Sequence, residues 1–334
     1  MIELQTLADA LRGSWLVQPF PPQTPLQGGA FDTRSLGSAQ IFFALRGEQS
    51  DGHDHLAKLV GTGVKLAVVS RPVTITGFSG AVLQVPDCLM ALAQAGAAML
   101  VRHPTRVVAI TGSYGKTTAK ELTAQVLARH LRVLKSEGSF NNEIGVPITL
   151  LQLDGSHEVA VLEFSARKPG DIDYLCRMAP PDVALLLNVG TAHIGVFGSR
   201  EAILHTKGEL FAHLRPGGLA VVAAQDARLA MIATKHGVPP ELIVRCGIAA
   251  DGVEGDYATA GEQSDEEGRL SFTGLRREPD GTPVHLPLRA GFPGPHGPQT
   301  LLFAWAVARA LGLSDAQAAP GLCAELAVKG RVRV

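Results

Sequence analysis

Hydrophobic residues in the first hundred positions of the chain fall into short continuous runs separated by amphipathic stretches. Short runs that are apolar throughout are typical of buried strands, whereas apolar residues recurring every three or four positions are typical of helices. Strands are therefore predicted at residues 40–45, 65–70 and 81–85. Helices are predicted at residues 3–11, 53–60 and 88–101. The last of these is shorter than the roughly 20 apolar residues that cross a bilayer, so we interpret it as a buried helix of a soluble protein.

A break in this pattern predicts a domain boundary. His103-Pro104-Thr105 interrupts the apolar periodicity, and a proline restricts the residue before it to extended conformations. We place the boundary there, with a first domain at residues 1–103 and a second at residues 104–330. The length of 334 residues is enough for two domains that each bury a core of their own.

The second domain alternates apolar strands with helical segments. Strands are predicted at residues 106–110, 159–163, 183–187 and 219–223. Helices are predicted at residues 119–130, 146–153, 170–178 and 199–214. Strands that are apolar throughout are buried on both faces, as in a parallel sheet covered by helices. The predicted fold class is α/β: a small α/β domain followed by a mostly parallel-sheet domain.

Beyond residue 251 the pattern changes to alternating polar and apolar positions. Residues 270–272 and 284–288 show a period of two, and the polar run GEQSDEEGRL precedes them as an exposed turn. We predict an antiparallel extension of the sheet here, followed by a last apolar helix at residues 300–313.

Composition excludes several classes of function. The chain has 30 Lys and Arg residues against 31 Asp and Glu residues, so it lacks the basic field that a nucleic-acid or anionic-membrane binder needs. Its 4 cysteines are far apart and form no CxxC, which argues against a zinc site or a disulfide framework. The N-terminus has no long apolar run and does not read as a signal peptide. We therefore expect a cytoplasmic protein.

The second domain opens with a strand that leads directly into the sequence TGSYGKTT and then into a helix. Backbone N–H groups of such a turn and the positive end of the helix dipole converge on phosphate oxygens. Lys116 is expected to hold the β- and γ-phosphates of ATP, and the Thr117 hydroxyl to bind Mg²⁺. The alternative is an ordinary glycine turn, which the position between an apolar strand and a helix disfavours. The predicted cofactor-binding residues of the loop are Thr111, Gly112, Ser113, Tyr114, Gly115, Lys116, Thr117 and Thr118.

Three further side chains are candidates for chemistry beyond phosphate binding. Glu163 ends a predicted strand at the edge where ligands of parallel sheets bind, and a carboxylate there often completes the Mg²⁺ shell. His193 follows the next predicted strand in the same way, and Lys207 lies on the helix for which Ser199 is a suitable N-cap. Taken alone, each has an ordinary interpretation: a solvated carboxylate, a packed or surface histidine, and a solvated helical lysine.

Four segments resemble the Mur ligases, and the likeness extends over nearly the whole chain. They are FDTRSLGSAQIFFALRGEQSDGHDH at residues 31–55, TGSYGKTTAKE at 111–121, SFNNEIGVPITLL at 139–151 and PDVALLLNVGTAHIGVFGSREAILHTKGELF at 181–211. The FNNEIG and DGHD segments are most similar to the members that join D-alanyl-D-alanine to UDP-N-acetylmuramoyl-tripeptide. The resemblance implies an ATP-dependent, ADP-forming ligase of peptidoglycan precursor synthesis. In that family ATP phosphorylates the tripeptide carboxylate, and the dipeptide amine then attacks the acyl phosphate.

The resemblance also implies catalytic and metal-binding roles. Like charges must be neutralised when a carboxylate approaches a triphosphate, and two Mg²⁺ ions together with Lys116 are the natural means. Thr117 and Glu163 would bind the ATP-bound ion, and Glu163 and His193 the second ion. Lys207 matches a lysine that is carbamylated by CO₂ in several members and can then support a metal site.

On the substrate side, the resemblance places the uridine site in the first domain. Thr33 and Arg34 match the Ser/Thr-Arg pair near the uridine, and Asn141 and Asn142 match the segment that holds the UDP-muramyl group. An asparagine-rich turn is the alternative for the last two. The chain is expected to act as a monomer.

The sequence departs from the family pattern in two places. The family's H-N-x-x-N helix start near the adenine becomes HGPQT, so His296 is kept while Gly297 and Thr300 replace the two asparagines. His296 is expected either to contact the base or to cap the last helix. The family's C-terminal domain, which contributes to the D-alanyl-D-alanine site, has no counterpart within the 334 residues. We therefore expect this chain to bind nucleotide but to ligate poorly, or not at all, by itself.

Alternative functions remain at this point. One is another ATP-dependent amide ligase, such as the sister enzyme that adds the third peptide residue, or a folylpolyglutamate synthase. The first domain argues against the synthase, which has no such uridine-binding domain. A different class is a non-catalytic nucleotide- or UDP-precursor-binding protein, which the altered adenine segment favours. A simple P-loop kinase or GTPase would not explain the first domain.

Overall fold

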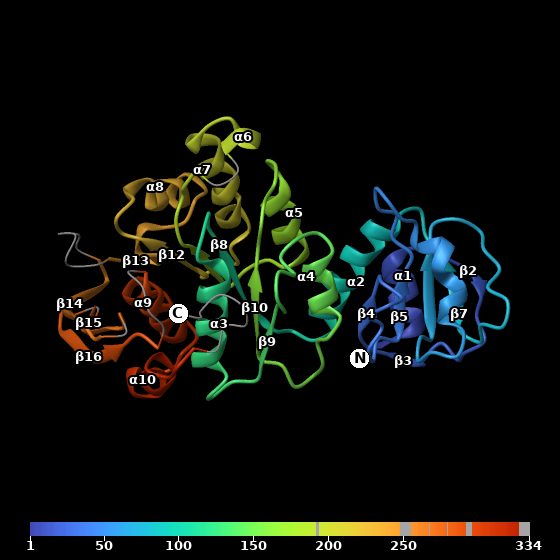
Figure 1. The fold of residues 1–334 in the computed structure, drawn as a ribbon, viewed down its shortest axis with the longest axis horizontal. Helices are drawn as coiled ribbons and strands as arrows, with labels where there is room; N and C mark the ends of the chain where they lie inside the picture. Colours follow the sequence, from blue (N-terminus) through green and yellow to red (C-terminus); the bar gives the residue numbers. More distant parts are fainter. Residues whose placement is uncertain (192–193, 248–254, 267, 279, 292–295, 327–334) are drawn as a thin grey trace. The chain divides into compact units, whose positions relative to one another are not determined.

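The computed structural model describes residues 1–191, 194–247, 255–266, 268–278, 280–291 and 296–326. The chain divides into two compact units, which are considered separately (Figure 1). The first unit comprises Met1–Thr105 and Phe140–His157, and the second comprises Arg106–Ser139 and Glu158–Val334. The first break in the chain thus lies at Thr105, close to the sequence boundary at residue 103. The segment Phe140–His157, which the sequence assigns to the second domain, packs with the first unit.

The first unit is built on a five-stranded sheet in the order β2-β7-β6-β5-β4. Strands β4 to β7 run parallel, and β2 pairs with β7 in the antiparallel direction. Its helices bury their apolar faces against this sheet and against each other, as amphipathic helices do. The strands are β1 (Ile2–Glu3), β2 (Ser14–Val17), β3 (Pro25–Leu26), β4 (Gly29–Ala30), β5 (Ile41–Phe43), β6 (Leu66–Val69) and β7 (Ala81–Gln84). The helices are α1 (Leu4–Leu11), the 3-10 helix η1 (Gly52–Leu59), α2 (Cys88–Arg102) and α4 (Gly145–Leu150).

Close backbone approaches explain two features of this unit. A Cβ atom on Gly52 would lie 2.9 Å from Ala44 Cα, so η1 begins with a glycine where it meets the strand region. A Cβ atom on Gly29 in β4 would lie 2.4 Å from Leu151 Cδ1. The residue after α4 therefore fills the space that the missing side chain leaves. This contact, together with the packing of α4 against α2, attaches Phe140–His157 to the first unit.

The second unit contains a nine-stranded sheet in the order β16-β15-β14-β13-β12-β11-β8-β10-β9. Pairing is parallel from β9 through β14 and antiparallel from β14 to β16, which confirms the mostly parallel sheet with an antiparallel extension. The parallel strands are β8 (Arg106–Thr111), β9 (Val133–Lys135), β10 (Val159–Glu163), β11 (Val183–Leu186), β12 (Leu219–Ala223) and β13 (Ile243–Cys246). The extension consists of β14 (Tyr257–Ser264), β15 (Leu270–Arg277) and β16 (Pro283–Arg289).

Helices cover the two faces of this sheet in separate groups. α3, α9 and α10 pack together on one face, while α7 packs against α8, and α5 against η2, on the other (Figure 1). The first group is α3 (Lys116–Leu127), α9 (Gly297–Ala310) and α10 (Asp315–Leu322). The second is α5 (Asp171–Met178), α6 (Ile194–Phe197), α7 (Arg200–Gly208), η2 (Glu209–His213), α8 (Ala227–Lys235) and η3 (Pro240–Leu242). No helix among the described residues is long and apolar enough to cross a membrane.

Two expected elements differ in detail from the observed ones. The helix predicted at residues 199–214 is observed as α7 followed by the 3-10 turn η2. Glu209 lies where the two meet, and its carboxylate accepts hydrogen bonds from the backbone N–H groups of Gly170 and Asp173 at the start of α5. The helix predicted from residue 119 begins at Lys116, because the loop lysine and threonines form its first turn.

A buried polar cluster joins the antiparallel extension to the last helices. Trp305 of α9 is fully buried, and its indole N–H donates to Asp315 Oδ1 over 2.8 Å. The Arg276 guanidinium of β15 donates to Asp315 Oδ2 over 2.7 Å and to Glu278. These hydrogen bonds and ion pairs raise the pKa of Arg276 against the opposing effect of burial. The satisfied charges fix β15 against α10, a helix that the sequence patterns did not predict.

Candidate functional site

The phosphate-binding loop lies between β8 and α3, at the carboxyl edge of the parallel sheet. Gly115 has a φ of +80° at the N-cap of α3, a conformation that side chains rarely adopt. A Cβ atom on Gly112 would lie 3.0 Å from Leu187 Cβ, so that glycine allows the loop to lie against the end of β11. The two glycines therefore have separate tasks, one in the turn and one in packing.

Asn188 braces this loop, a role that sequence reasoning missed. Its Oδ1 accepts from the backbone N–H groups of Ser113, over 3.0 Å, and Tyr114, over 3.2 Å, and its Nδ2 donates to Tyr114 O over 3.1 Å. Gly190 N–H donates to Ser113 Oγ over 2.9 Å, and a Cβ atom on Gly190 would lie 3.0 Å from the Tyr114 ring. The one available signal was the NVG sequence directly after a strand at the sheet edge.

This brace limits which amides can meet a phosphate. The N–H groups of Ser113 and Tyr114 both donate to Asn188 Oδ1, so in this structure they are already paired within the protein. The first turn of a helix leaves its N–H groups without intrahelical carbonyl partners. The opening turn of α3, at Lys116, Thr117 and Thr118, is therefore the part of the loop best suited to an anion.

Two lysines meet at one carbonyl of the loop. Lys116 Nζ donates to Gly112 O over 2.9 Å, and Lys207 Nζ donates to the same oxygen over 3.0 Å. Lys207 belongs to α7, which Ser199 caps by accepting from Ala202 N–H, as expected for an N-cap serine. Only 7 % of Lys207 is exposed, which contradicts the interpretation as a solvated helical lysine. Burial lowers the pKa of Lys207 from 10.5 to about 7, and the positive charge of Lys116 adds to the shift.

A hydroxyl and a carboxylate meet beside the loop. Thr117 Oγ1 donates to Glu163 Oε2 over 3.1 Å. Glu163 is only 2 % exposed at the end of β10, which pairs with β8 so that Glu163 lies opposite Ile110. The interpretation as a solvated carboxylate at a strand end is therefore wrong. Oxygen ligands of this kind are those that Mg²⁺ prefers, and Mg²⁺ is commonly held by one or two carboxylates plus substrate phosphates.

Other metal-binding expectations are not tested by the structure. His193 lies outside the described residues. Within the described part of the chain, no group of three or more His, Cys, Asp or Glu side chains is arranged to hold a metal ion. The oxygen pair of Thr117 and Glu163 fits a Mg²⁺ that is completed by phosphate and water.

His296 lies directly before α9, where its ring approaches the loop. The ring centroids of His296 and Tyr114 are 5.8 Å apart with an interplanar angle of 41°. Thr300, at one of the two expected asparagine positions, donates its hydroxyl to His296 O over 2.8 Å, and Gly297 is buried. Neither position presents a carboxamide, and the rings of His296 and Tyr114 are the aromatic groups near this helix start.

The substrate residues predicted for the first domain all lie in the first unit. Arg34 is exposed, and its guanidinium forms a bidentate pair with Asp32, with Nη2 2.7 Å from Oδ2. The hydrogen bonds from Arg34 lower the pKa of Asp32 to about 2. Asn142 Oδ1 accepts from the N–H groups of Ile144 and Gly145 at the start of α4, while Asn141 and Thr33 are half-buried. Asn142 therefore has the structural role of a turn residue, whatever else it binds.

Comparison with known proteins identifies the family. A model of the Mur ligase middle domain matches residues 110–293, more than half of the chain. This chain belongs to the Mur ligase family. It is 38% identical over 303 residues to the UDP-N-acetylmuramoyl-tripeptide–D-alanyl-D-alanine ligase of Synechocystis, covering 90% of this chain and 62% of that protein.

Solved structures agree with this assignment. MurF from Acinetobacter baumannii superposes with a TM-score of 0.84 at 34% identity, covering 99% of this chain and 70% of that one. MurF from Thermotoga maritima in complex with ADP superposes with a TM-score of 0.75 at 28% identity, covering 91% of this chain and 67% of that one. The Mur ligase fold is therefore shown. The chain spans less than two thirds of the length of the Synechocystis ligase.

Proposed function

We propose that this Mur ligase joins D-alanyl-D-alanine to UDP-N-acetylmuramoyl-tripeptide at the expense of ATP, in cytoplasmic peptidoglycan precursor synthesis. One observation carries the proposal: Thr117 and Glu163 meet beside the phosphate loop while Lys116 and Lys207 meet at Gly112 O. This grouping places two lysine amines and an oxygen pair around the opening turn of α3. The identity of 35% to 38% with proteins named UDP-N-acetylmuramoyl-tripeptide–D-alanyl-D-alanine ligase supports the choice of substrates.

The proposed reaction has two steps, and the residues of this chain act mainly on the first. An oxygen of the tripeptide carboxylate attacks the γ-phosphorus of ATP, forming the acyl phosphate while the bond to the ADP oxygen breaks. Lys116 and the α3 amides bind the phosphate oxygens, so that charge is neutralised where the two anions meet. Thr117 and Glu163 would hold Mg²⁺, which supplies further positive charge at the phosphates. The dipeptide amine then attacks the acyl carbon, loses a proton, and inorganic phosphate leaves.

Lys207 is proposed to be carbamylated. Only a neutral amine attacks CO₂, and a pKa of about 7 gives Lys207 a large neutral fraction at physiological pH. The product is an anionic carbamate, and the proton lost from nitrogen goes to solvent. The carbamate keeps one N–H that can still donate to Gly112 O. With Glu163 and His193, its oxygens would serve a second Mg²⁺.

Carbamylation can be tested directly. With ¹³C-labelled bicarbonate at pH 8, we expect a carbamate carbonyl resonance in wild type that is missing in Lys207→Met. Lys235→Met provides the matched control, because it removes an exposed lysine at the end of α8 and leaves Lys116 and the Lys207 amine unchanged. A wild-type spectrum without the labelled resonance contradicts carbamylation, while leaving nucleotide binding untouched.

The first unit is proposed to bind the UDP-muramyl end of the precursor. Thr33 and Arg34 would face the uridine diphosphate, and Asn141 and Asn142 the muramyl group. The exposed guanidinium of Arg34 supports this, since Asp32 orients its planar fork and exposed donors remain for a phosphate or a uracil. His296 and Tyr114 would contact the adenine of ATP.

Ligand binding tests the proposed function as a whole. Isothermal titration calorimetry should show binding of Mg-ATP and, separately, of UDP-N-acetylmuramoyl-tripeptide to the wild-type chain. Lys116→Met should abolish the first and preserve the second. Lys235→Met, which removes an exposed lysine at the end of α8, should change neither. If the wild-type chain binds neither Mg-ATP nor UDP-N-acetylmuramoyl-tripeptide, the proposal is disproved.

A further inference from the structure

Lys120 is a lysine with no solvent-exposed surface, and none of the roles proposed above includes it. It lies on α3, one turn after Thr117. Its Nζ donates to Ser136 O over 2.6 Å and to Gly138 O over 3.1 Å, and lies 3.1 Å from Glu121 Oε1. An ammonium group has three N–H donors, so these three acceptors satisfy it completely. A buried charge persists only when it is paired and hydrogen-bonded in this way.

The turn that Lys120 holds is attached to the proposed metal ligand. Ser136 directly follows β9, and its N–H donates to Val161 O over 3.2 Å. Ser136 Oγ accepts from the backbone N–H of Glu163 over 3.4 Å. The Glu163 carboxylate in turn accepts from Thr117. These contacts form a continuous chain of hydrogen bonds. It runs from Thr117 through Glu163 and Ser136 to Lys120, so that it starts and ends on α3.

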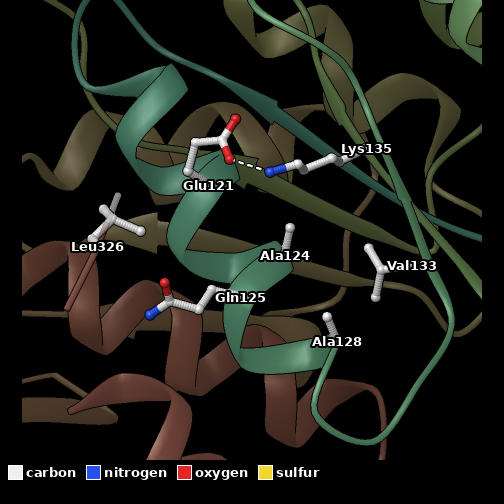
Figure 2. A pocket seen from close by; sticks show the side chains of 7 residues that line it. All are labelled: Glu121, Ala124, Gln125, Ala128, Val133, Lys135 and Leu326. Carbon is white, nitrogen blue, oxygen red and sulfur yellow. Dashed lines mark hydrogen bonds and ion pairs between the residues drawn. The ribbon is translucent and has the colours of Figure 1, made fainter. Parts of the chain in front are cut away.

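Glu121 is the counter-ion that completes this arrangement. Figure 2 shows its carboxylate on α3 joined to Lys135 of β9, at a pocket of about 310 Å³ that Leu326 also lines. Burial alone would raise the pKa of Glu121, but the hydrogen bonds from Lys135 and Lys120 outweigh it and lower the pKa. Glu121 is therefore ionised at neutral pH. Glu121 therefore pairs with Lys135, which lines the pocket, and with Lys120, which is fully buried.

We infer that Lys120 is a positioning residue of the Mg-nucleotide site, holding the Ser136 turn so that Glu163 faces Thr117. The inference rests on the proposed binding of Mg-ATP. The competing interpretation is a purely structural one, in which Lys120 only anchors β9 to α3. The two differ in one measurable respect, because a positioning residue affects the Mg²⁺-dependent part of nucleotide affinity and a structural anchor does not.

The test measures ADP affinity by calorimetry with Mg²⁺ and with EDTA, well below the melting temperature of each variant. The Mg²⁺ gain is the ratio of the ADP affinity measured with Mg²⁺ to that measured with EDTA. In Lys120→Met we expect this gain to fall about tenfold or more, as it does when other partners of metal ligands are removed. The affinity in EDTA should change less than about twofold. Lys135→Met is the matched control: it removes the other cation of Glu121, leaves both carbonyl contacts of Lys120, and should keep the wild-type gain.

Ser136→Ala keeps the test decisive if Lys120→Met does not fold. It removes only the oxygen that accepts from Glu163 N–H and leaves the carbonyl that Lys120 binds. We expect the Mg²⁺-dependent gain to fall about threefold, as the loss of one modest hydrogen bond implies. The positioning role is overturned if the ADP affinity falls equally with Mg²⁺ and with EDTA. It is also overturned if both variants keep the wild-type Mg²⁺ gain. A wild-type chain that binds no nucleotide at all refutes the proposed function itself.

Discussion

Two buried lysines lie in different surroundings, Lys120 on α3 and Lys207 on α7. Lys120 has two carbonyl acceptors and a carboxylate within hydrogen-bonding distance. Lys207 has, among the described residues, one carbonyl acceptor and a second lysine beside it. Similar burial therefore has different consequences. Lys120 has an acceptor for each of its N–H donors, whereas poor compensation makes Lys207 an amine that is readily neutral and reactive.

The largest expected effect tests this contrast through folding stability. Lys120→Met leaves the buried Ser136 carbonyl without its donor, loses the hydrogen bond to Gly138 O and removes the interior partner of Glu121, so we expect the free energy of unfolding to fall by about 3 kcal/mol. Lys207→Met loses one hydrogen bond but also removes a poorly compensated charge whose burial lowers the pKa, so at pH 7 it should leave the free energy of unfolding unchanged or raise it. Urea unfolding of both variants checks the difference. Equal losses of unfolding free energy in the two variants would show that the surroundings of Lys120 and Lys207 compensate a buried lysine equally well.

The pH dependence of stability sharpens the contrast. The pKa of Lys207 is lower in the folded chain, about 7, than its unfolded value of 10.5. Between these values the unfolded chain binds more protons, so stability should rise with pH, by up to about 1.4 kcal/mol per unit from this group. Comparing wild type with Lys207→Met between pH 7.5 and about 9 isolates the contribution. A wild-type slope no steeper than that of the variant contradicts the lowered pKa.

A smaller effect is expected from the brace on the loop. Asn188→Ala removes the side-chain acceptor that the Ser113 and Tyr114 N–H groups share, leaves Ser113 N–H only its contact with the Asn188 backbone oxygen, and should weaken Mg-ATP binding about tenfold by loosening the loop. Asn188→Asp keeps an acceptor for those amides but places a carboxylate oxygen where Nδ2 donates to Tyr114 O. It should therefore weaken binding at least as much. Calorimetry on both variants, with unfolding curves as controls, measures the effect. Wild-type affinity in Asn188→Ala would refute the brace.

The smallest effect concerns the rings of Tyr114 and His296. If Tyr114 and His296 contact the base, Tyr114→Ala should weaken ATP binding about fivefold while leaving inorganic tripolyphosphate binding unchanged, since stacking acts only on the base. Tyr114→Phe retains the ring and should behave like wild type. An equal loss for ATP and tripolyphosphate would instead assign Tyr114 to the phosphates.

The loop and its oxygen ligands were the most predictable part of the site. Gly112, Gly115 and the Lys116-Thr117 pair are contiguous, so one strand-turn-helix unit determines their geometry. Glu163 could be anticipated because parallel strands end at one edge of a sheet. Asn188 could not, because its role depends on which amides of a loop 74 residues away along the chain face it. The ordinary interpretation of Lys207 failed because helical position alone does not show what packs over it.

The sequence by itself determined the α/β class, the phosphate loop and the most apolar strands, which are β5 to β7 in the first sheet and β8, β10, β11 and β12 in the second, because these depend on local periodicity and on contiguous motifs. Tertiary structure alone decided that Phe140–His157 packs with the first unit, that Asn188 occupies two loop amides and that Lys120 and Lys207 are buried. The physical reason is that burial and pairing are properties of neighbours brought together by folding. A lysine in a helical pattern carries the same local signal whether water or a backbone carbonyl accepts its hydrogen bonds.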